Sequence, residues 1–413
     1  MFRYAPPAHA PLTLADLRIA LFNYLASRRE GARFVLCFEE PGHESEVLEA
    51  LGLCGIVGEG VHYRRDNLRI HQHMAVKLLQ ERKAFACFCD PERLAERQKE
   101  AERAGRSYRY DGGCERLSDA EVLDNPNPFT VRLRRPDAPV TVEDELWGMR
   151  RVTPEEMDCV VIMERDKRAS KPFAEAVDDM LLDISLIVAP LEEMEDSAIQ
   201  EHIRRALGYD RGVRYAHIEP GEGESEVTVR SLFEAGFLPE ALIRYLLATG
   251  YDKENSFHRV DETAKAFLVK KISPRAEKFD ISFLRRLNQE EIARMDAKEL
   301  SRVFGFADSA VGEVAKAFLP WCETLEELKP RVAAVFGPKP LNDADVYRLS
   351  RLVASADQTD SFARLCDYLT QKTGLEDEAL QKPLRRLLTG QDEGPELETL
   401  YPHLQSYLKE IIK

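Results

Sequence analysis

The chain has 413 residues, of which 44% are hydrophobic and 32% charged, and its formal net charge is −15. This length suffices for about two to four domains, and the composition excludes a fibrous or unstructured protein. We expect a cytoplasmic protein with no membrane partner. No apolar run approaches the ~20 residues of a membrane helix, prolines interrupt the N-terminus, and the eight cysteines lack disulfide-framework spacing.

The first part of the chain predicts alternating helices and strands, and the rest predicts helices alone. Thr13 and Asp16 form an acidic capping box before the first helix, Leu14–Ser27. The other predicted helices are Asn67–Gln80, Pro91–Ala104 and Phe173–Leu182, and the predicted strands are Phe34–Phe38, Phe129–Leu133, Val140–Val142, Cys159–Met163 and Ile184–Val188. From Thr228 onward the pattern is helical, with breaks at Gly250, Pro320, Gly337–Pro340, Gly374 and Gly390–Pro395.

This order of elements predicts an α/β domain of the nucleotide-binding type, followed by a long all-α half. We assign the strands at 129–133 and 140–142 to a small module inserted into the α/β domain. We find no internal repeat and no low-complexity tract. These patterns do not by themselves name a substrate.

Several motifs resemble those of bacterial glutamyl-tRNA synthetases. Arg3–Tyr24 reads RYAPPAHAPLTLADLRIALFNY and is similar to the family opening R-F-A-P-S-P-T-G-x-x-H-I-G-x-x-R-x-A-L-F-N-Y. Similar stretches follow at Phe85–Glu92, Tyr108–Cys114, Phe173–Ser185, Tyr215–His217, Gly236–Tyr245, Ile272–Asn288 and Gly390–Leu400. The resemblance covers nearly the whole chain, so it implies a shared fold. Shared activity is a separate question, because function depends on the site.

The resemblance implies a class I synthetase architecture in four parts. Residues 1–76 and 150–227 form a Rossmann-type catalytic-like domain. Residues 77–149 form a connective insertion, like the part of the family that contacts the acceptor stem. Residues 228–310 form a helical stem-contact-like region, and residues 311–413 form an all-helical anticodon-binding-like domain.

The first ATP signature of the family, H-I-G, is replaced here by Thr13, Leu14 and Ala15. Thr13 lacks the reach and charge of the histidine, Ala15 adds a Cβ where adenine packs, and the Asp16 carboxylate repels a triphosphate at the helix N-terminus. We interpret these residues as a helix cap rather than as catalytic groups. His9, four residues upstream, is an alternative replacement for the histidine.

The second ATP signature, K-M-S-K-R, is expected between His217 and Gly236. Residues 218–235 read IEPGEGESEVTVRSLFEA, which contains no lysine, one arginine (Arg230) and five glutamates. This connection is shorter than is usual in the family. We interpret it as a surface turn that joins two domains.

The amino-acid pocket of the family is also altered. The resemblance places Arg3, Ala5 and Glu39 in this pocket, and Arg3 and Glu39 persist where the substrate's ammonium and carboxylate groups bind. The arginine that pairs with the substrate's γ-carboxylate is Ala189 here, and a family tyrosine is Lys171. A lysine is a poor geometric replacement for that arginine. We therefore predict a lost or changed glutamate pocket, in which Arg3 and Glu39 are free to pair with each other.

Cys87, Cys89 and Cys114 match the spacing of zinc ligands in many family members. The family's fourth ligand position is Arg116, which cannot bind a metal. Tyr108, Tyr110, Asp111 or Glu115 could complete a weaker zinc site. The alternative is that the three cysteines are free thiols packed under the insertion.

The densest basic stretch provides the candidates for tRNA contact. Its members are Lys270, Lys271, Arg275, Lys278, Arg285 and Arg286. The alternative to tRNA contact is that these residues form a solvated helical face, since acidic residues lie between them in the sequence. The resemblance also implies a structural role for the carboxylate pair Asp178 and Asp179.

The sequence favours a synthetase-like protein that has lost ordinary ATP-dependent glutamylation and that binds tRNA, another synthetase or a regulatory protein. Two alternatives stay open. The first is an active glutamate–tRNA ligase with atypical residues such as His9 and Lys171, which would use ATP and Mg²⁺. The second is a nucleotide-using enzyme of the same fold with a changed substrate.

Overall fold

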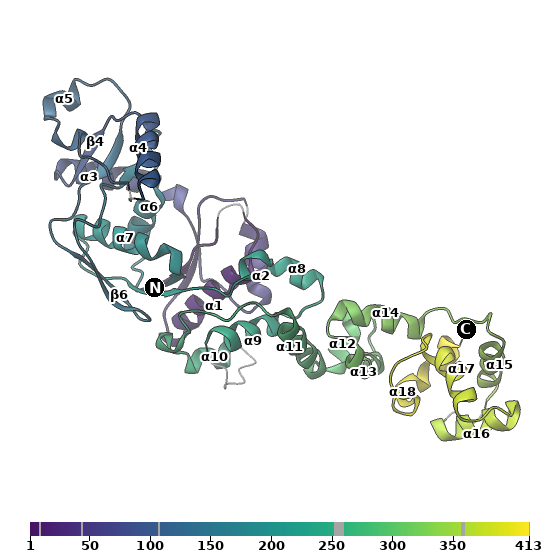
Figure 1. The fold of residues 1–413 in the computed structure, drawn as a ribbon. Helices are drawn as coiled ribbons and strands as arrows, with labels where there is room; N and C mark the ends of the chain where they lie inside the picture. Colours follow the sequence, from purple (N-terminus) through teal and green to yellow (C-terminus); the bar gives the residue numbers. More distant parts are fainter. Residues whose placement is uncertain (8–9, 43, 106–107, 252–259, 357–359, 413) are drawn as a thin grey trace. The chain divides into compact units, whose positions relative to one another are not determined.

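The computed structural model describes residues 1–413 except 8–9, 43, 106–107, 252–259, 357–359 and 413. The described residues form two compact units, Met1–Val229 with Leu246–Phe279, and Arg230–Tyr245 with Asp280–Lys413. The first unit contains both β-sheets, whereas the second is helical (Figure 1). This is the fold class that the sequence predicts: an α/β catalytic-type domain with an insertion, then an all-α half. The finer division into four parts stays a prediction.

The larger sheet has seven strands in the order β3-β2-β1-β9-β10-β6-β7. Their bounds are Phe2–Tyr4 for β1, Phe34–Phe38 for β2, Val61–Tyr63 for β3, Val140–Asp144 for β6, Gly148–Val152 for β7, Leu186–Pro190 for β9 and Arg214–Ile218 for β10. All neighbours pair in parallel except β7, which is antiparallel to β6. The carboxyl ends of the six parallel strands therefore meet at one edge, where ligands bind in open α/β sheets.

Helices flank this sheet in the first unit: α1 (Leu14–Arg29), α2 (Glu44–Leu53), α3 (Leu68–Gln80), α6 (Lys171–Leu181), α7 (Met194–Ala206) and α10 (Val260–Ala266). Helix α1 is buried along most of its length and contacts β1, β2 and β9. On α1, the Asn23 amide donates to the Val188 carbonyl at 2.8 Å and accepts from the Val188 N–H at 2.9 Å. Asn23 therefore completes the backbone bonding of β9.

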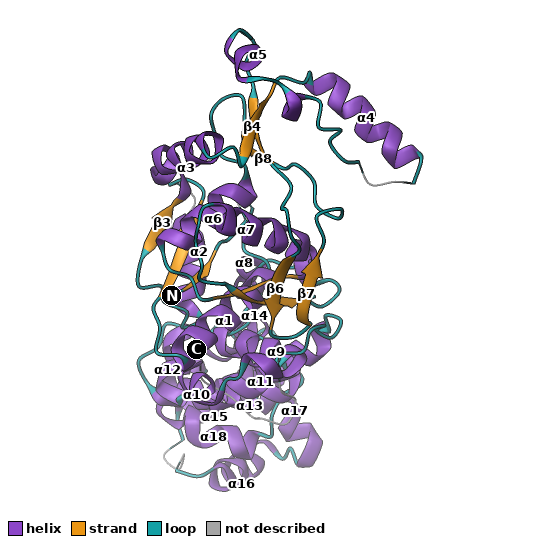
Figure 2. Cartoon of the chain, turned by 90° about the vertical axis from the view of Figure 1, so that its left-hand side faces the viewer, coloured by secondary structure: helices purple, strands orange, loops and turns teal. Residues whose placement is uncertain are grey.

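The inserted module contains the antiparallel strands β4 (Ala84–Cys87), β5 (Thr130–Leu133) and β8 (Val161–Met163), with helices α4 (Pro91–Arg103) and α5 (Asp119–Leu123). Its apolar side chains share one core with α3, α6 and α7. Helix α4 has no buried residue, as its charged pattern predicts, and lies outside that core (Figure 2).

The structure corrects one strand assignment. The strand predicted at Val140–Val142 extends to Asp144 and pairs with β10 of the larger sheet, not with the inserted module. The module instead takes β8, which begins at Val161 rather than Cys159, and β9 lies two residues beyond the predicted Ile184–Val188. Apolar runs predict that a strand is buried, but they do not say which sheet it joins.

The second half of the chain is helical, as expected. Its helices are α8 (Val229–Glu234), α9 (Pro239–Gly250), α11 (Ile281–Arg294), α12 (Ala297–Val303), α13 (Ser309–Ala317), α14 (Leu325–Phe336), α15 (Ala344–Ala354), α16 (Phe362–Thr373), α17 (Asp377–Thr389), α18 (Leu397–Leu404) and α19 (Leu408–Ile411). Helices α16 and α17 end at Gly374 and Gly390, whose φ angles of +74° and +71° favour glycine. None of the helices in the described part of the chain is long and apolar enough to span a membrane.

Candidate functional site

The N-terminus of α1 is capped by its own side chains. Thr13 Oγ1 accepts the Asp16 N–H at 3.1 Å, and Asp16 Oδ2 accepts from the Thr13 N–H at 2.9 Å and from the Thr13 hydroxyl at 2.6 Å. The Leu14 N–H donates to the Val227 carbonyl at 2.8 Å. The predicted capping box is confirmed. It occupies backbone donors that a phosphate would need at a helix N-terminus.

A pocket of about 590 Å³ lies beside this cap. Thr13, Ala15 and Asp16 line it, whereas Leu14 points into the core and is fully buried. The described lining contains three carboxylates, from Asp16, Glu192 and Glu219, and no lysine, arginine or histidine. This pocket is therefore open, and its described lining offers no cation to a triphosphate. His9 lies outside the described residues.

The segment 218–235 joins the two units, as the sequence predicts, but it is not simply a surface turn. Glu224 is fully buried and forms a two-pronged ion pair with Arg18, which is also fully buried; the Arg18 Nε–Glu224 Oε2 distance is 2.9 Å. Arg18 also donates to the Leu246 carbonyl at 2.7 Å and the Thr249 hydroxyl at 2.8 Å. Glu224, one of the acids in this segment, is thus buried and holds the segment against α1.

The backbone of the same segment packs closely against residues 274–279. The Glu219 N–H donates to the Pro274 carbonyl at 2.8 Å, and the Ala276 N–H donates to the Glu219 carbonyl at 2.9 Å. A Cβ at Gly221 would lie 2.1 Å from the Glu277 carbonyl oxygen, so only glycine fits there. Residues 218–229 of the short connection are therefore an ordered part of the first unit.

A second pocket, of about 410 Å³, lies at the carboxyl ends of β1, β2 and β9. All five residues that the sequence assigns to an amino-acid pocket line it: Arg3, Ala5, Glu39, Lys171 and Ala189. The structure thus brings these residues together, and their role in binding stays a prediction.

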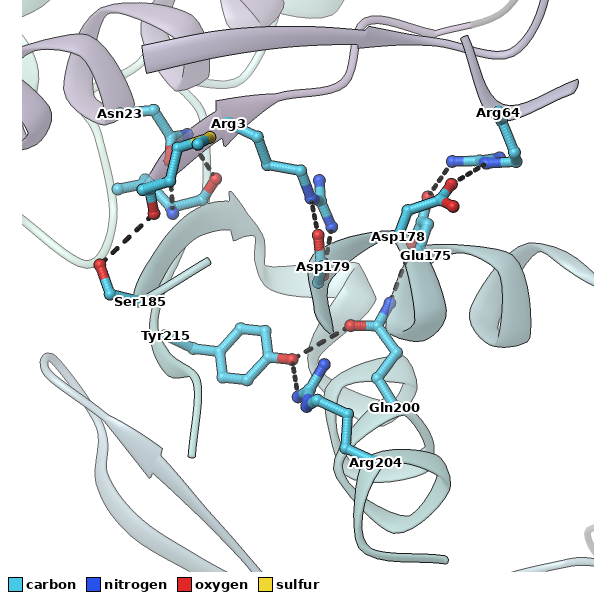
Figure 3. Close-up of polar contacts among 12 residues, drawn as sticks. Arg3, Asn23, Arg64, Glu175, Asp178, Asp179, Ser185, Gln200, Arg204 and Tyr215 are labelled. Carbon is cyan, nitrogen blue, oxygen red and sulfur yellow. Dashed lines mark hydrogen bonds and ion pairs between the residues drawn. The ribbon is translucent and has the colours of Figure 1, made fainter. Parts of the chain in front are cut away.

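The cations on the wall of this second pocket are already paired with acids. Arg3 binds Asp179 through two hydrogen bonds of 2.5 and 3.1 Å (Figure 3), which corrects the expected pairing of Arg3 with Glu39. Lys171 Nζ lies 2.7 Å from Glu193 Oε1. Burial would lower the pKa of Lys171, but Glu175 and Glu193 raise it above its usual value. Position 189 is an alanine, and the described wall is rich in acids. That this is a changed glutamate pocket stays a prediction.

Sequence reasoning missed Arg64 and Glu175 in the second pocket. Arg64 Nη2 donates to Glu175 Oε1 at 2.9 Å, and Glu175 Oε2 accepts from Gln200 at 2.9 Å. Gln200 accepts from Tyr215, which also accepts from the fully buried Arg204 at 2.6 Å (Figure 3). Burial raises the pKa of Glu175 despite the nearby arginines. Arg64 directly follows the carboxyl end of β3. Had the sequence revealed this short strand, Arg64 would have been a candidate site residue, because it lies at the same sheet edge as the pocket.

The other predicted carboxylate, Asp178, has structural partners. Its Oδ1 lies 2.7 Å from His71 Nε2 and accepts from Asn67 at 2.9 Å. Together, Asp178 and Asp179 tie α6 to α3 and to β1, which agrees with the structural role that the resemblance implies.

The three predicted zinc ligands form one cluster. The Sγ atoms of Cys87, Cys89 and Cys114 lie within 4.8 Å of one another, and those of Cys89 and Cys114 are 3.6 Å apart. A tetrahedral site with Zn–S bonds of ~2.3 Å sets sulfur atoms about 3.7 Å apart. The Tyr110 hydroxyl lies 3.6 Å from the Cys87 sulfur and 3.5 Å from the Cys89 sulfur. The three sulfur positions fit a zinc ion, and the Tyr110 hydroxyl lies beside two of them. Its role as a fourth ligand stays a prediction.

The basic residues predicted to contact tRNA are divided between the two units. Lys270, Lys271, Arg275 and Lys278 belong to the first unit, and Arg285 and Arg286 to the second. Most have acidic partners: Lys270 with Glu145, Arg275 with Glu219, Lys278 with Glu222, and Arg285 with Glu323 and Glu327. Their role in tRNA binding stays a prediction.

Comparison with known proteins agrees with these features. Residues 1–286 match the family of class I tRNA synthetases (E and Q), catalytic domain. The chain is 35% identical to glutamate–tRNA ligase 2 of Sulfurimonas denitrificans and 36% identical to glutamate–tRNA ligase 1 of a Nitratiruptor species, each over the full length of both chains.

A solved structure of a glutamate–tRNA ligase from Elizabethkingia meningosepticum, in complex with its amino acid, has the same fold. It superposes with a TM-score of 0.81 at 21% identity, covering 99% of this chain and 98% of that one. On the family match and the full-length relatives, this chain belongs to the glutamyl-tRNA synthetase family of class I tRNA synthetases.

Proposed function

We propose that this family member has lost ordinary ATP-dependent glutamylation of tRNA and acts by binding tRNA. The observation that carries the proposal is the self-capped start of α1. The Asp16 carboxylate, the Val227 carbonyl and the Thr13 hydroxyl accept three backbone N–H groups there, and the carboxylate places negative charge where the triphosphate of ATP would lie. Removing one transition-state contact typically costs about 3–4 kcal/mol, and here several are replaced together.

The charge of both pockets supports the same conclusion. In the pocket beside the α1 cap, the described ionisable residues are all carboxylates, which would repel a triphosphate. In the pocket at the ends of β1, β2 and β9, glutamate would need cations for its two carboxylates. The cations there, Arg3, Arg64 and Lys171, already have acidic partners. A dicarboxylate would have to displace these acids or lie unpaired beside them.

Two other functions follow from specific observations. The names of the full-length relatives favour an active glutamate–tRNA ligase with atypical residues, such as Lys171, in its pocket. The open pocket beside Ala15 favours a nucleotide-using enzyme with a different substrate. A protein partner, either an authentic synthetase or a regulatory protein, is the alternative to tRNA as the ligand.

ATP–pyrophosphate exchange separates these functions. The purified chain is assayed with each amino acid, with and without tRNA, beside the Sulfurimonas denitrificans relative as a positive control. Binding of tRNA is measured separately by filter retention at several salt concentrations. We expect no exchange above background and salt-sensitive binding of tRNA.

Each other outcome has a definite meaning. Exchange with glutamate at a rate near that of the relative would overturn the proposal. Exchange with another amino acid would establish the changed-substrate enzyme. No exchange and no binding up to about 100 µM tRNA, near the usual range of non-specific nucleic-acid affinity, would leave a protein partner.

A further inference from the structure

Trp147 is an exposed aromatic side chain that is nevertheless held in place. It lies in the turn between β6 and β7, and 44% of its surface is exposed. Its indole N–H donates to the His217 carbonyl at 2.8 Å. The Arg275 guanidinium lies over the ring, 5.9 Å from its centroid. The ring therefore has a fixed orientation before any partner binds.

The turn that carries Trp147 is organised by the buried carboxylate of Asp144. Its Oδ1 accepts the N–H groups of Leu146 at 2.8 Å and of Trp147 at 2.9 Å. Its Oδ2 accepts the His217 N–H at 3.1 Å and lies 2.6 Å from His217 Nδ1. Burial would raise the pKa of Asp144, but these hydrogen bonds hold it below its usual value. Asp144 thus stays charged and fixes the turn.

Ser197 completes this network, because its hydroxyl lies 2.8 Å from His217 Nε2. Asp144, His217 and Ser197 have the order of a hydrolytic triad. All three are buried, however, and none lines either of the two pockets described above. Their role is to position the turn and its tryptophan.

The turn lies at the same edge of the sheet as the two pockets. Strands β9, β10 and β6 are parallel neighbours, so their carboxyl ends share one edge. Neighbouring strands are about 4.8 Å apart. The register therefore puts Asp144, the last residue of β6, roughly 10 Å across the sheet from Ile187, three residues before β9 ends. Arg275, which covers Trp147, also pairs at 3.0 Å with Glu219 on the wall of the first pocket. A chain a few nucleotides long could extend from the pocket edge to Trp147.

The surroundings of Trp147 suit a nucleic-acid strand. The side chains of Lys270 and Arg275 are 79% and 71% exposed. A Cβ built on Gly148 would meet nothing within 4 Å, so the space beside the turn is open. Aromatic rings flanked by cations stack bases and neutralise phosphates. A protein partner would require a larger apolar surface than Trp147 and its exposed neighbour Met149 provide.

We propose that Trp147 is a stacking platform for a base of an unpaired RNA strand, with Arg275 and Lys270 beside the adjacent phosphates. The proposal rests on the proposed function, in which tRNA is the ligand. The unpaired 3′ end that every tRNA carries is the strand that fits this position.

Fluorescence tests the proposal directly, because the chain contains only two tryptophans, Trp147 and Trp321. In the Trp321→Phe protein, Trp147 is the sole tryptophan, and the Trp147→Phe protein serves as the matched control. Each is titrated with tRNA and with the same tRNA lacking its unpaired 3′ nucleotides, while filter retention measures binding independently. We expect intact tRNA to quench Trp147, truncated tRNA to quench it much less, and Trp321 to be unaffected.

Affinity provides a second measurement. We expect Trp147→Ala to weaken binding of intact tRNA roughly 5- to 100-fold, the usual contribution of one stacked base, and to leave binding of truncated tRNA unchanged. Trp147→Phe keeps a flat ring and should lose less. Circular dichroism confirms that each variant is folded.

The possible failures are distinct. If tRNA binds but Trp147 is not quenched, or is quenched equally by the truncated tRNA, the platform is overturned and the proposed function stands. An affinity of Trp147→Ala equal to that of the unsubstituted chain would also overturn the platform alone. If no tRNA binds, both the platform and tRNA binding as the function are overturned.

Discussion

At the scale of single residues, the buried pair of Arg18 and Glu224 shows that an acid in the segment 218–235 has a structural role. Neither side chain is exposed to solvent, and Arg18 has two further acceptors. Charges buried in this way are tolerated only when paired, and removing one partner leaves the other charge without compensation. The pair therefore links α1 to the residues that follow β10.

We predict that Glu224→Gln lowers the free energy of unfolding by about 3–5 kcal/mol, because Arg18 would keep a buried charge without its carboxylate. The matched control is Glu222→Gln, two residues away, where the exposed pair with Lys278 contributes at most about 1 kcal/mol. Urea unfolding of the three proteins at pH 7 measures the difference. Equal effects of the two substitutions would contradict a buried ion pair at Glu224.

His202 predicts a dependence of stability on pH. Its side chain is nearly buried, its Nε2 lies 2.8 Å from the Arg134 carbonyl, and burial lowers its pKa below the usual value near 6.5. A lowered pKa in the folded state means that folding disfavours the charged form. The contribution of His202 is thus fully present above about pH 6.5 and is lost as the pH falls toward the folded-state pKa.

We therefore expect the unsubstituted chain to lose more stability between pH 7.5 and pH 5.5 than His202→Asn, which keeps a hydrogen-bonding side chain but does not titrate. Urea unfolding of both proteins at the two pH values is the measurement. A parallel loss in the two proteins would mean that other groups set the pH dependence.

The contacts of these residues show what the sequence can and cannot predict. The Thr13–Asp16 cap was predictable because its members lie three residues apart and use only local backbone geometry. Arg3 pairs with Asp179 across 176 positions, and Arg18 with Glu224 across 206. Such pairs depend on how distant elements pack, so the expected pairing of Arg3 with Glu39 was wrong although both residues do line one pocket.

At the scale of elements, the inserted module depends on a small cluster of thiols. Cys87 ends β4, Cys89 follows it, and Cys114 is brought close to both by Tyr110, whose hydroxyl also accepts the Cys114 N–H at 2.9 Å. The spacing of the cysteines predicted the cluster, whereas the position of the Tyr110 hydroxyl beside two of the sulfurs became visible only in the structure. The Tyr108 hydroxyl, by contrast, is buried and has no hydrogen-bond partner among the residues that the structure describes.

We predict that the purified chain contains about one zinc ion per molecule, held by three thiolates and Tyr110. Cys114→Ser should abolish zinc binding, and Tyr110→Phe should weaken it 10-fold or more, as loss of a ligand or of its supporting contacts does. Inductively coupled plasma mass spectrometry gives the metal content, and competition with a chelator gives the affinity. Cys366→Ser, at a cysteine of the second unit, is the control. A metal-free chain after growth with zinc would establish the alternative of free thiols.

Elements also differ in how well the sequence predicts them. Helix ends were predictable where a glycine or proline stops the helix, as at Gly374 and Gly390. The assignment of β6 was not, because pairing with β10 is a long-range choice that its apolar run does not encode. The turn after β6, which carries Trp147, was therefore assigned to the inserted module, and its place at the sheet edge became visible only in the fold.

At the scale of the whole molecule, the net charge of −15 limits how the proposed ligand, tRNA, could bind. An acidic chain cannot hold a polyanion over most of its surface, so binding must use a local set of cations. Four of the six predicted contact residues have acidic partners, which compete with phosphates for them. Strong binding that depends on many phosphate contacts is therefore not expected.

We predict that the logarithm of the tRNA binding constant falls with the logarithm of the salt concentration with a slope no steeper than about −5, the value for six phosphate contacts. Lys271→Ala should weaken binding and reduce the steepness by about 1. Filter binding between 50 and 300 mM salt measures both slopes. A slope near −10 would show that other cations of the chain carry the interaction.

Under the proposed function, the capped start of α1 also bears on whether a phosphate site could be restored there. A side-chain cap contributes about 1 kcal/mol to helix stability, and at this position the capping carboxylate is also the group that repels phosphate. Any single reversion that frees the helix N-terminus therefore weakens the fold before it gains a ligand. Under the proposed function, a phosphate site at this helix would therefore be easier to lose than to restore, because restoring it costs stability.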